Sequence, residues 1–171
     1  AEDYIARRLA IMRQISYDNK IDFSEVIDLE EENNGIQYEK IQREAINLAL
    51  SKGFLVLTGG PGTGKTTTLN AIISLYQQQG LNVMICAPTG RAAKRMSETT
   101  GEEASTLHRL LEIGKVDEES LFKKDNEYQG APIDGDIIIV DEVSMVDMFI
   151  MSYLLDCIYP VSYTHLRAHE T

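Results

Sequence analysis

A glycine-rich run between an apolar segment and a helical pattern constrains the fold of this chain more than any other feature. Residues 59–66 read GGPGTGKT and match the phosphate-loop pattern G-x-x-x-x-G-K-[ST] at every fixed position. The preceding residues 54–58 (FLVLT) are apolar and partly β-branched, which predicts a buried strand. Residues 66–79 carry apolar side chains at helical spacing and are followed by Gly80, where the helix should stop. Strand, loop and helix in this order direct backbone N–H groups onto a polyphosphate.

The residues of this loop have predicted roles in holding a nucleoside triphosphate. Glycines allow positive φ and a close approach of the backbone to phosphate. Lys65 is expected to neutralise the β- and γ-phosphates and to stabilise charge during transfer, and the Thr66 hydroxyl is expected to ligate Mg²⁺. A glycine-rich turn without a ligand is the alternative. The predicted nucleotide-binding residues are Gly59, Gly60, Pro61, Gly62, Thr63, Gly64, Lys65, Thr66 and Thr67.

A second segment predicts the metal-binding part of a nucleotide site. Residues 136–142 (DIIIVDE) form an apolar run that ends in two adjacent carboxylates. Four consecutive β-branched residues indicate a strand covered on both faces, and open α/β sheets place ligands at the C-terminal ends of such strands. We predict that Asp141 holds Mg²⁺ and that Glu142 polarises the attacking water. With Lys65 they form the predicted catalytic set, and an ordinary acidic turn is the alternative.

Composition is compatible with one globular domain and leaves a nucleic-acid partner open. The 171 residues are 43% hydrophobic and 25% charged, and no apolar run is long enough to cross a bilayer. Cys86 and Cys157 lie in apolar surroundings, which predicts a reduced, cytoplasmic setting without disulfides. The net charge of −11 alone argues against binding a polyanion. However, the acids gather in residues 22–44 and 117–136, whereas residues 90–95 carry three bases and no acid.

The chain as a whole is predicted to hold part of one α/β domain. Residues 1–35 are expected to be the end of an upstream region, with the acidic stretch 28–34 as a linker closed by Gly35. Residues 36–160 form the predicted domain, and 161–171 (VSYTHLRAHET) continue no earlier pattern, which indicates an extraneous cloning tail. Further predicted elements are helices over 4–12, 36–50, 91–97, 105–111 (capped by Ser105) and 148–158, a strand over 82–87, and a surface loop or weak hairpin over 114–135.

Four segments in order carry a family resemblance. They are GGPGTGKTTT (59–68), APTGRAAKRM (87–96), ASTLHRLL (104–111) and IIIVDEVSMVD (137–147). They resemble motifs I, Ia, Ib and II of RecD-like superfamily 1 ATP-dependent DNA helicases, the family of the exodeoxyribonuclease V alpha subunit and its stand-alone relatives. The resemblance covers roughly residues 36–160. It implies a RecA-like P-loop NTPase fold, a parallel sheet with flanking helices, which is incomplete here.

The resemblance also implies further site residues. Gln42 is similar to the family's adenine-reading glutamine, whose amide can donate and accept at once; a solvated helix residue is the alternative. For His108, a plain surface histidine is an equal alternative, and Lys94 and Arg95 are expected to be a solvated face. Contacts to the DNA backbone carry little sequence information, which suits a motor that advances over any sequence. The implied contacts to single-stranded DNA are Pro88, Thr89, Gly90, Arg91, Thr106 and His108.

The function implied by the resemblance is ATP-driven 5′ to 3′ translocation on single-stranded DNA. Such a motor unwinds a duplex junction in recombination and repair, alone or inside a nuclease complex, in the cytoplasm. Motif III and the second motor domain, with the arginine that reaches the γ-phosphate, do not follow motif II here, so we expect this polypeptide by itself to unwind nothing. Two alternatives stay open: another P-loop ATPase or kinase, and a nucleotide-binding module without unwinding activity.

Overall fold

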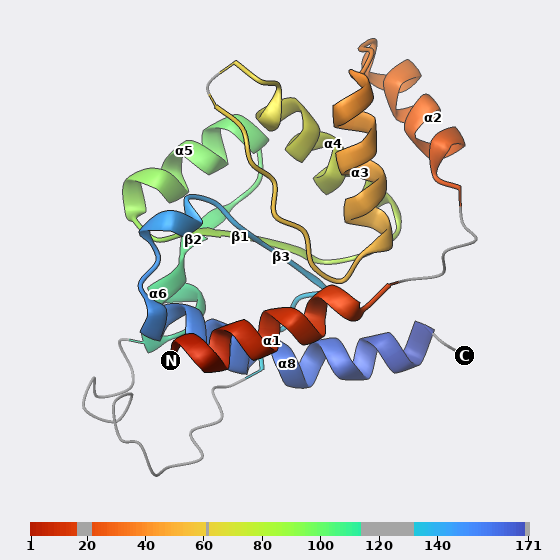
Figure 1. The fold of residues 1–171 in the computed structure, drawn as a ribbon. Helices are drawn as coiled ribbons and strands as arrows, with labels where there is room; N and C mark the ends of the chain where they lie inside the picture. Colours follow the sequence, from red (N-terminus) through yellow and green to blue (C-terminus); the bar gives the residue numbers. More distant parts are fainter. Residues whose placement is uncertain (17–21, 61, 114–131, 170–171) are drawn as a thin grey trace. The chain divides into compact units, whose positions relative to one another are not determined.

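The computed structural model describes residues 1–16, 22–60, 62–113 and 132–169 (Figure 1). They divide into two compact units, one made of residues 6–81 and the other of Ala1–Ile5 with Asn82–Thr171, and each is described by itself. Helices and a small parallel sheet make up the described residues, so the predicted α/β class is confirmed. None of the helices within these ranges has the length and apolar character that crossing a membrane requires.

The sheet has three parallel strands with β1 in the centre. β1 (Val83–Ala87) pairs on one side with β2 (Ala104–Thr106) and on the other with β3 (Ile137–Val140). The strands predicted over 82–87 and at 136–140 are therefore confirmed. β3 pairs with β1 alone among the described strands, and its four residues are half-buried rather than covered on both faces. Because the strands are parallel, the segments that follow them meet at one edge of the sheet.

Helices cover both faces of this sheet (Figure 1). Neighbouring residues of a strand point to opposite faces, and Cys86 and Ala87 of β1 belong to separate apolar clusters. Ala87 packs with two alanines of α5 (Gly90–Thr100), whereas Cys86 packs with residues of α6 (Leu107–Leu110) and α8 (Met148–His169). Burial raises the pKa of the Cys86 thiol to about 12, so this cysteine acts as a small core residue rather than a nucleophile.

The other unit has a core shared by three helices. α2 (Ser24–Asn34), α3 (Lys40–Ser51) and α4 (Lys65–Gln78) surround one apolar cluster. A buried carboxylate, Glu30, is satisfied by side-chain amides: Asn34 Nδ2 donates to one oxygen at 2.9 Å, and Gln78 Nε2 to the other at 2.8 Å. The buried members of the cluster are Ile27, Tyr38, Ile46, Ala49, Leu50, Ala71, Ile72 and Leu75.

The linker predicted over 28–34 is wrong as local structure, because these residues lie in α2. The acidic composition does not indicate that this helix has a buried face, which carries Ile27 and Glu30. Gly35 ends the helix in the left-handed conformation (φ 64°). The predicted N-terminal helix is confirmed as α1 (Glu2–Gln14), and the helix predicted over 36–50 is α3. Ile41, expected on the apolar side of that helix, is 74% exposed.

The strand predicted over residues 54–58 is also wrong. No strand is assigned there, and Val56 is 62% exposed. A strand requires a neighbour to take its N–H and C=O groups, and the three described strands of the sheet pair with one another and not with this segment.

Smaller differences concern helix ends. Ser105 does not cap a helix, because it lies in β2 and pairs with Cys86; Thr106 caps α6 instead, its Oγ1 accepting from the Arg109 N–H at 3.2 Å. α5 is longer than the predicted 91–97, and α8 continues through Pro160, past its predicted end at 158. The loop or hairpin predicted over 114–135 falls mostly on residues 114–131, outside the described residues.

Candidate functional site

The loop before α4 has the backbone that its glycines allow. Gly62 and Gly64 have φ of 77° and 74°, in the left-handed region that favours glycine. The Thr63 hydroxyl donates to the Gly60 carbonyl at 2.8 Å, and Pro61 lies outside the described residues. α4 begins at Lys65 with Gly64 as its N-cap. The first N–H groups of a helix have no acceptor within the helix, so this loop ends where an anion can be bound.

The carbonyl of Gly64 is fixed by three donors. The Thr68 N–H and the Thr68 hydroxyl each donate to it at 3.0 Å, and Gln42 Nε2 donates at 3.1 Å. The structure therefore brings Gln42 to the end of the phosphate loop. Gln42 Oε1 accepts from the Glu39 N–H at 2.8 Å, which completes a capping box at the start of α3. The sequence signal of this contact is the spacing E-x-x-Q over 39–42, and the adenine-reading role of Gln42 stays a prediction.

Replacing Gly64 with alanine should destabilise the chain more than replacing Gly62. Both substitutions force alanine into positive φ, at a similar cost. A Cβ on Gly64 would clash with Gln42 Nε2, whereas one on Gly62 meets nothing within 4 Å. Gln42 must move and give up its hydrogen bond, which adds about 1 kcal/mol to the loss of unfolding free energy. Urea denaturation of the two variants measures the difference.

The double variant Gln42→Ala/Gly64→Ala provides the internal control for this comparison. If the added loss comes from Gln42, the two substitutions together should cost less than the sum of their separate effects. Equal destabilisation by Gly62→Ala and Gly64→Ala would show that Gln42 does not support the loop.

The two predicted acids follow β3 directly. The Asp141 N–H donates to the Cys86 carbonyl at 3.0 Å, so the pairing with β1 continues past the end of the strand. Glu142 has φ 50° and ψ 43° and caps the short 3-10 helix η2 (Val143–Met145). Left-handed backbone is uncommon for a residue other than glycine and is concentrated at functional sites. Both acids are half-buried at the C-terminal edge of the sheet.

An arginine that is expected to belong to a solvated helix face contacts one of these acids. Arg95 of α5 donates a hydrogen bond from its guanidinium to Glu142 Oε1 and forms an ion pair with it. The side chain of Arg95 is 58% exposed, as expected for a solvated face, but its contact with Glu142 was not predicted. The available signal was weak: Arg95 lies four residues after Arg91, hence on the same helix face, in the one segment of the domain that gathers bases.

The predicted DNA contacts lie at the same edge of the sheet. Thr89 follows β1 and caps α5, its Oγ1 accepting from the Ala92 N–H at 3.2 Å. Thr106 ends β2, where it pairs with Ala87, and caps α6. A threonine hydroxyl that accepts from its helix still has its own hydrogen to donate to a phosphate. The other predicted contacts, Pro88, Gly90, Arg91 and His108, follow the same strand ends, and all but the half-buried Pro88 are exposed.

The structure thus collects the predicted residues into two groups. One unit holds the phosphate loop with Gln42, and the other holds Asp141 and Glu142 with all six predicted DNA contacts. Within the second unit, neighbouring parallel strands bring the acids and the DNA contacts to one edge, as the strand order requires.

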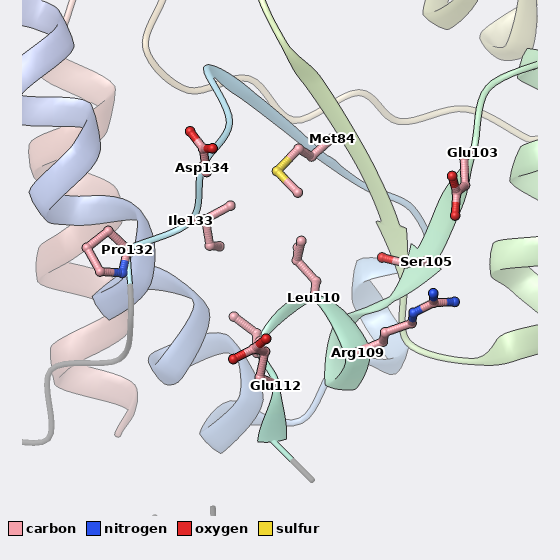
Figure 2. Close-up of a pocket in the computed structure, with 10 residues that line it drawn as sticks. Met84, Glu103, Ser105, Arg109, Leu110, Glu112, Pro132, Ile133 and Asp134 are labelled. Carbon is pink, nitrogen blue, oxygen red and sulfur yellow. The ribbon is translucent and has the colours of Figure 1, made fainter. Parts of the chain in front are cut away.

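A separate pocket contains none of these residues (Figure 2). It lies between Met84 at the start of the central strand, the α6 region and residues 132–134. It has no part in the predicted nucleotide or DNA contacts. Its lining residues are Met84, Glu103, Ser105, Arg109, Leu110, Leu111, Glu112, Pro132, Ile133 and Asp134.

Comparison with known proteins identifies the class of domain. Residues 42–166 match the family described as an AAA domain, and the chain belongs to that family. The predicted P-loop NTPase fold is therefore confirmed.

The more specific similarity is to RecD-like helicases. The chain is 49% identical over 106 residues to the ATP-dependent RecD2 DNA helicase of Deinococcus radiodurans, an alignment that covers 62% of this chain and 14% of that protein. It is 38% identical over 142 residues to the RecBCD enzyme subunit RecD of Mycolicibacterium smegmatis, covering 70% and 25%. It is 35% identical over 127 residues to the ATP-dependent DNA helicase dda of Enterobacteria phage T4, covering 70% and 28%. The predicted RecD-like resemblance is confirmed, and the chain spans between 14% and 28% of the length of these relatives.

Proposed function

We infer that this chain is the nucleotide-binding motor domain of an ATP-dependent DNA helicase. The observation that carries this inference is the loop in which left-handed Gly62 and Gly64 lead into α4 at Lys65. That backbone suits a polyphosphate, and the names of the relatives point to ATP as its nucleotide and DNA as its track. The activity inferred for the helicase that contains this domain is 5′ to 3′ translocation on single-stranded DNA with unwinding at a duplex junction.

The loop residues bind and orient the triphosphate. Backbone N–H groups of residues 62–66 donate to phosphate oxygens, and the Lys65 amine neutralises the β- and γ-phosphates. Lys65 is half-buried, which strengthens its attraction for phosphate relative to a fully solvated amine. The Thr66 hydroxyl is exposed in the first turn of α4 and is the inferred loop ligand of Mg²⁺. Gln42 holds the Gly64 carbonyl, and so keeps the last turn of the loop in place.

The acids supply the metal ligand and the proton acceptor. The backbone of Asp141 is anchored at the sheet edge by the hydrogen bond from its N–H to the Cys86 carbonyl, and its carboxylate is the second inferred ligand of Mg²⁺. When bound, Mg²⁺ neutralises charge on the phosphates and polarises them toward attack. Glu142 is the inferred acceptor of the proton from the attacking water. The donor set of hydroxyl, carboxylate and phosphate oxygens is the set that Mg²⁺ prefers.

The inferred DNA contacts at the C-terminal edge of the sheet bind DNA without regard to its base sequence. Thr89 and Thr106 can donate hydroxyl hydrogen bonds to phosphates, and Arg91 adds a positive charge next to the first of them. Backbone contacts of this kind hold any single strand. The inferred setting is cytoplasmic recombination and repair. A nuclease complex is a second inferred partner, because the sequence resembles the family of the exodeoxyribonuclease V alpha subunit and the M. smegmatis relative is named as a subunit of the RecBCD enzyme.

Phosphate release with and without single-stranded DNA tests this function. The complete polypeptide that the gene encodes should release phosphate from ATP slowly alone and several-fold faster with an oligothymidylate present. A kinase or an unrelated P-loop ATPase would show no response to DNA. Binding of a fluorescent ATP analogue without any phosphate release would instead indicate a nucleotide-binding module.

A further inference from the structure

The carboxylate inferred to accept a proton is already engaged by a basic side chain. Arg95 donates its guanidinium hydrogen bond to Glu142 Oε1. A guanidinium paired with a carboxylate favours the ionised form of that carboxylate, so Glu142 is a weaker proton acceptor while it holds Arg95. The ion pair also joins two parts of the sheet edge, because α5 begins directly after Thr89 and Glu142 comes directly after β3 and Asp141.

Arg95 can exchange its carboxylate partner for another anion. The side chains of Arg95 and Glu142 are 58% and 29% exposed, so water and other anions reach both. Exposed ion pairs correspond to only about 1.5- to 5-fold in an equilibrium constant. Guanidinium groups bind phosphate with two parallel hydrogen bonds, which a single carboxylate oxygen does not offer. A phosphate group is therefore an effective competitor for Arg95.

Arg95 lies in the path of the predicted DNA contacts. Arg91 and Arg95 are four residues apart on α5, so their Cβ atoms are roughly 5–6 Å apart on one helix face. Both side chains are exposed, and between them the buried Ala92 and Ala93 pack toward the sheet. A DNA strand that contacts Thr89 and Arg91 therefore passes close to the Arg95 guanidinium, which contacts Glu142.

The backbone of Glu142 indicates a held conformation. Its φ of 50° lies in the left-handed region, where a residue with a Cβ atom is strained. Such a conformation persists only when surrounding contacts stabilise it. Within the described residues, the ion pair to Arg95 is one such contact, and the start of η2 is another.

We propose that Arg95 is a positioning residue shared by Glu142 and single-stranded DNA. Without DNA, Arg95 holds the Glu142 carboxylate; a DNA phosphate that takes the guanidinium releases this carboxylate to accept the proton of the attacking water. The device makes ATP hydrolysis depend on DNA, and it rests on the function inferred above. Because coupling between two sites is reciprocal, Glu142 and DNA must compete for Arg95 even when no nucleotide is present.

The competition can be measured as DNA affinity alone. Fluorescence anisotropy of a labelled oligothymidylate gives Kd for the wild type, Glu142→Gln, Arg95→Gln and the double variant, all without nucleotide. Glu142→Gln removes the charge that holds Arg95, so Kd should fall about 2- to 5-fold. Arg95→Gln should raise Kd, and in that background Glu142→Gln should leave Kd unchanged.

Two substitutions on the same helix control for simple charge effects. Glu98→Gln removes an exposed acid and Lys94→Gln an exposed base, both on α5 beside Arg95. If Glu142→Gln tightens binding no more than Glu98→Gln does, or tightens it equally without Arg95, the shared role of Arg95 is wrong while the helicase assignment stands. If the wild type binds no oligothymidylate, the DNA partner and the shared role both fail.

Discussion

Lys65→Ala is expected to abolish ATP turnover and to leave the fold intact. Lys65 is the first residue of α4, directly after the N-cap Gly64. Its amine supplies the charge that neutralises the transferring phosphoryl group, and removing one such preorganised contact typically costs at least about 10²-fold in rate. Alanine is the best helix former, so α4 should still form. Phosphate release from the complete polypeptide measures the rate, and circular dichroism verifies the helix content.

A matched lysine separates this effect from the loss of any positive charge. Lys40 is also the first residue of a helix in the same unit, α3, but its side chain is exposed and lies outside the phosphate loop. Lys40→Ala should therefore hydrolyse ATP at the wild-type rate. Full activity in Lys65→Ala would overturn the nucleotide site itself, whatever the result with Lys40.

The features that could be predicted from sequence are those specified locally. The glycine loop and α4 depend on residues that adjoin in the chain, and the same holds for β1 and β3 with their apolar runs. The DNA contacts and the acids follow predicted parallel strands. Because the C-terminal ends of parallel strands lie at the same edge of a sheet, their shared location could be predicted as well.

The failures have a common physical cause, which is dependence on distant partners. Residues 54–58 have strand composition but no paired neighbour, and a strand exists only through its partner. The acidic run in α2 has the composition of a linker, and its sequence does not reveal that Gln78 on α4, 48 residues away, donates a hydrogen bond to Glu30. Arg95 is exposed as expected, but the sequence does not reveal that its acceptor is Glu142, 47 residues away. Single-sequence periodicity carries no information on such pairs.

Glu142→Gln is expected to bind ATP normally and to hydrolyse it about 10²- to 10⁴-fold more slowly, the usual contribution of a general base. Glutamine has the length of glutamate, and its amide oxygen can still accept a hydrogen bond from Arg95, so the start of η2 should be kept. The lost property is the ability to accept a proton. A fluorescent ATP analogue measures affinity, and single-turnover phosphate release measures the chemical step.

The comparison with Glu98→Gln makes this result specific to Glu142. Glu98 is an exposed acid on α5, so its substitution removes the same charge without touching the predicted proton acceptor. That variant should hydrolyse ATP at the wild-type rate. Weak nucleotide binding with normal turnover in Glu142→Gln would assign Glu142 to binding rather than proton transfer. In that case the Arg95 contact would help to shape the nucleotide site. It could not control proton transfer, because Glu142 would not be the residue that accepts the proton.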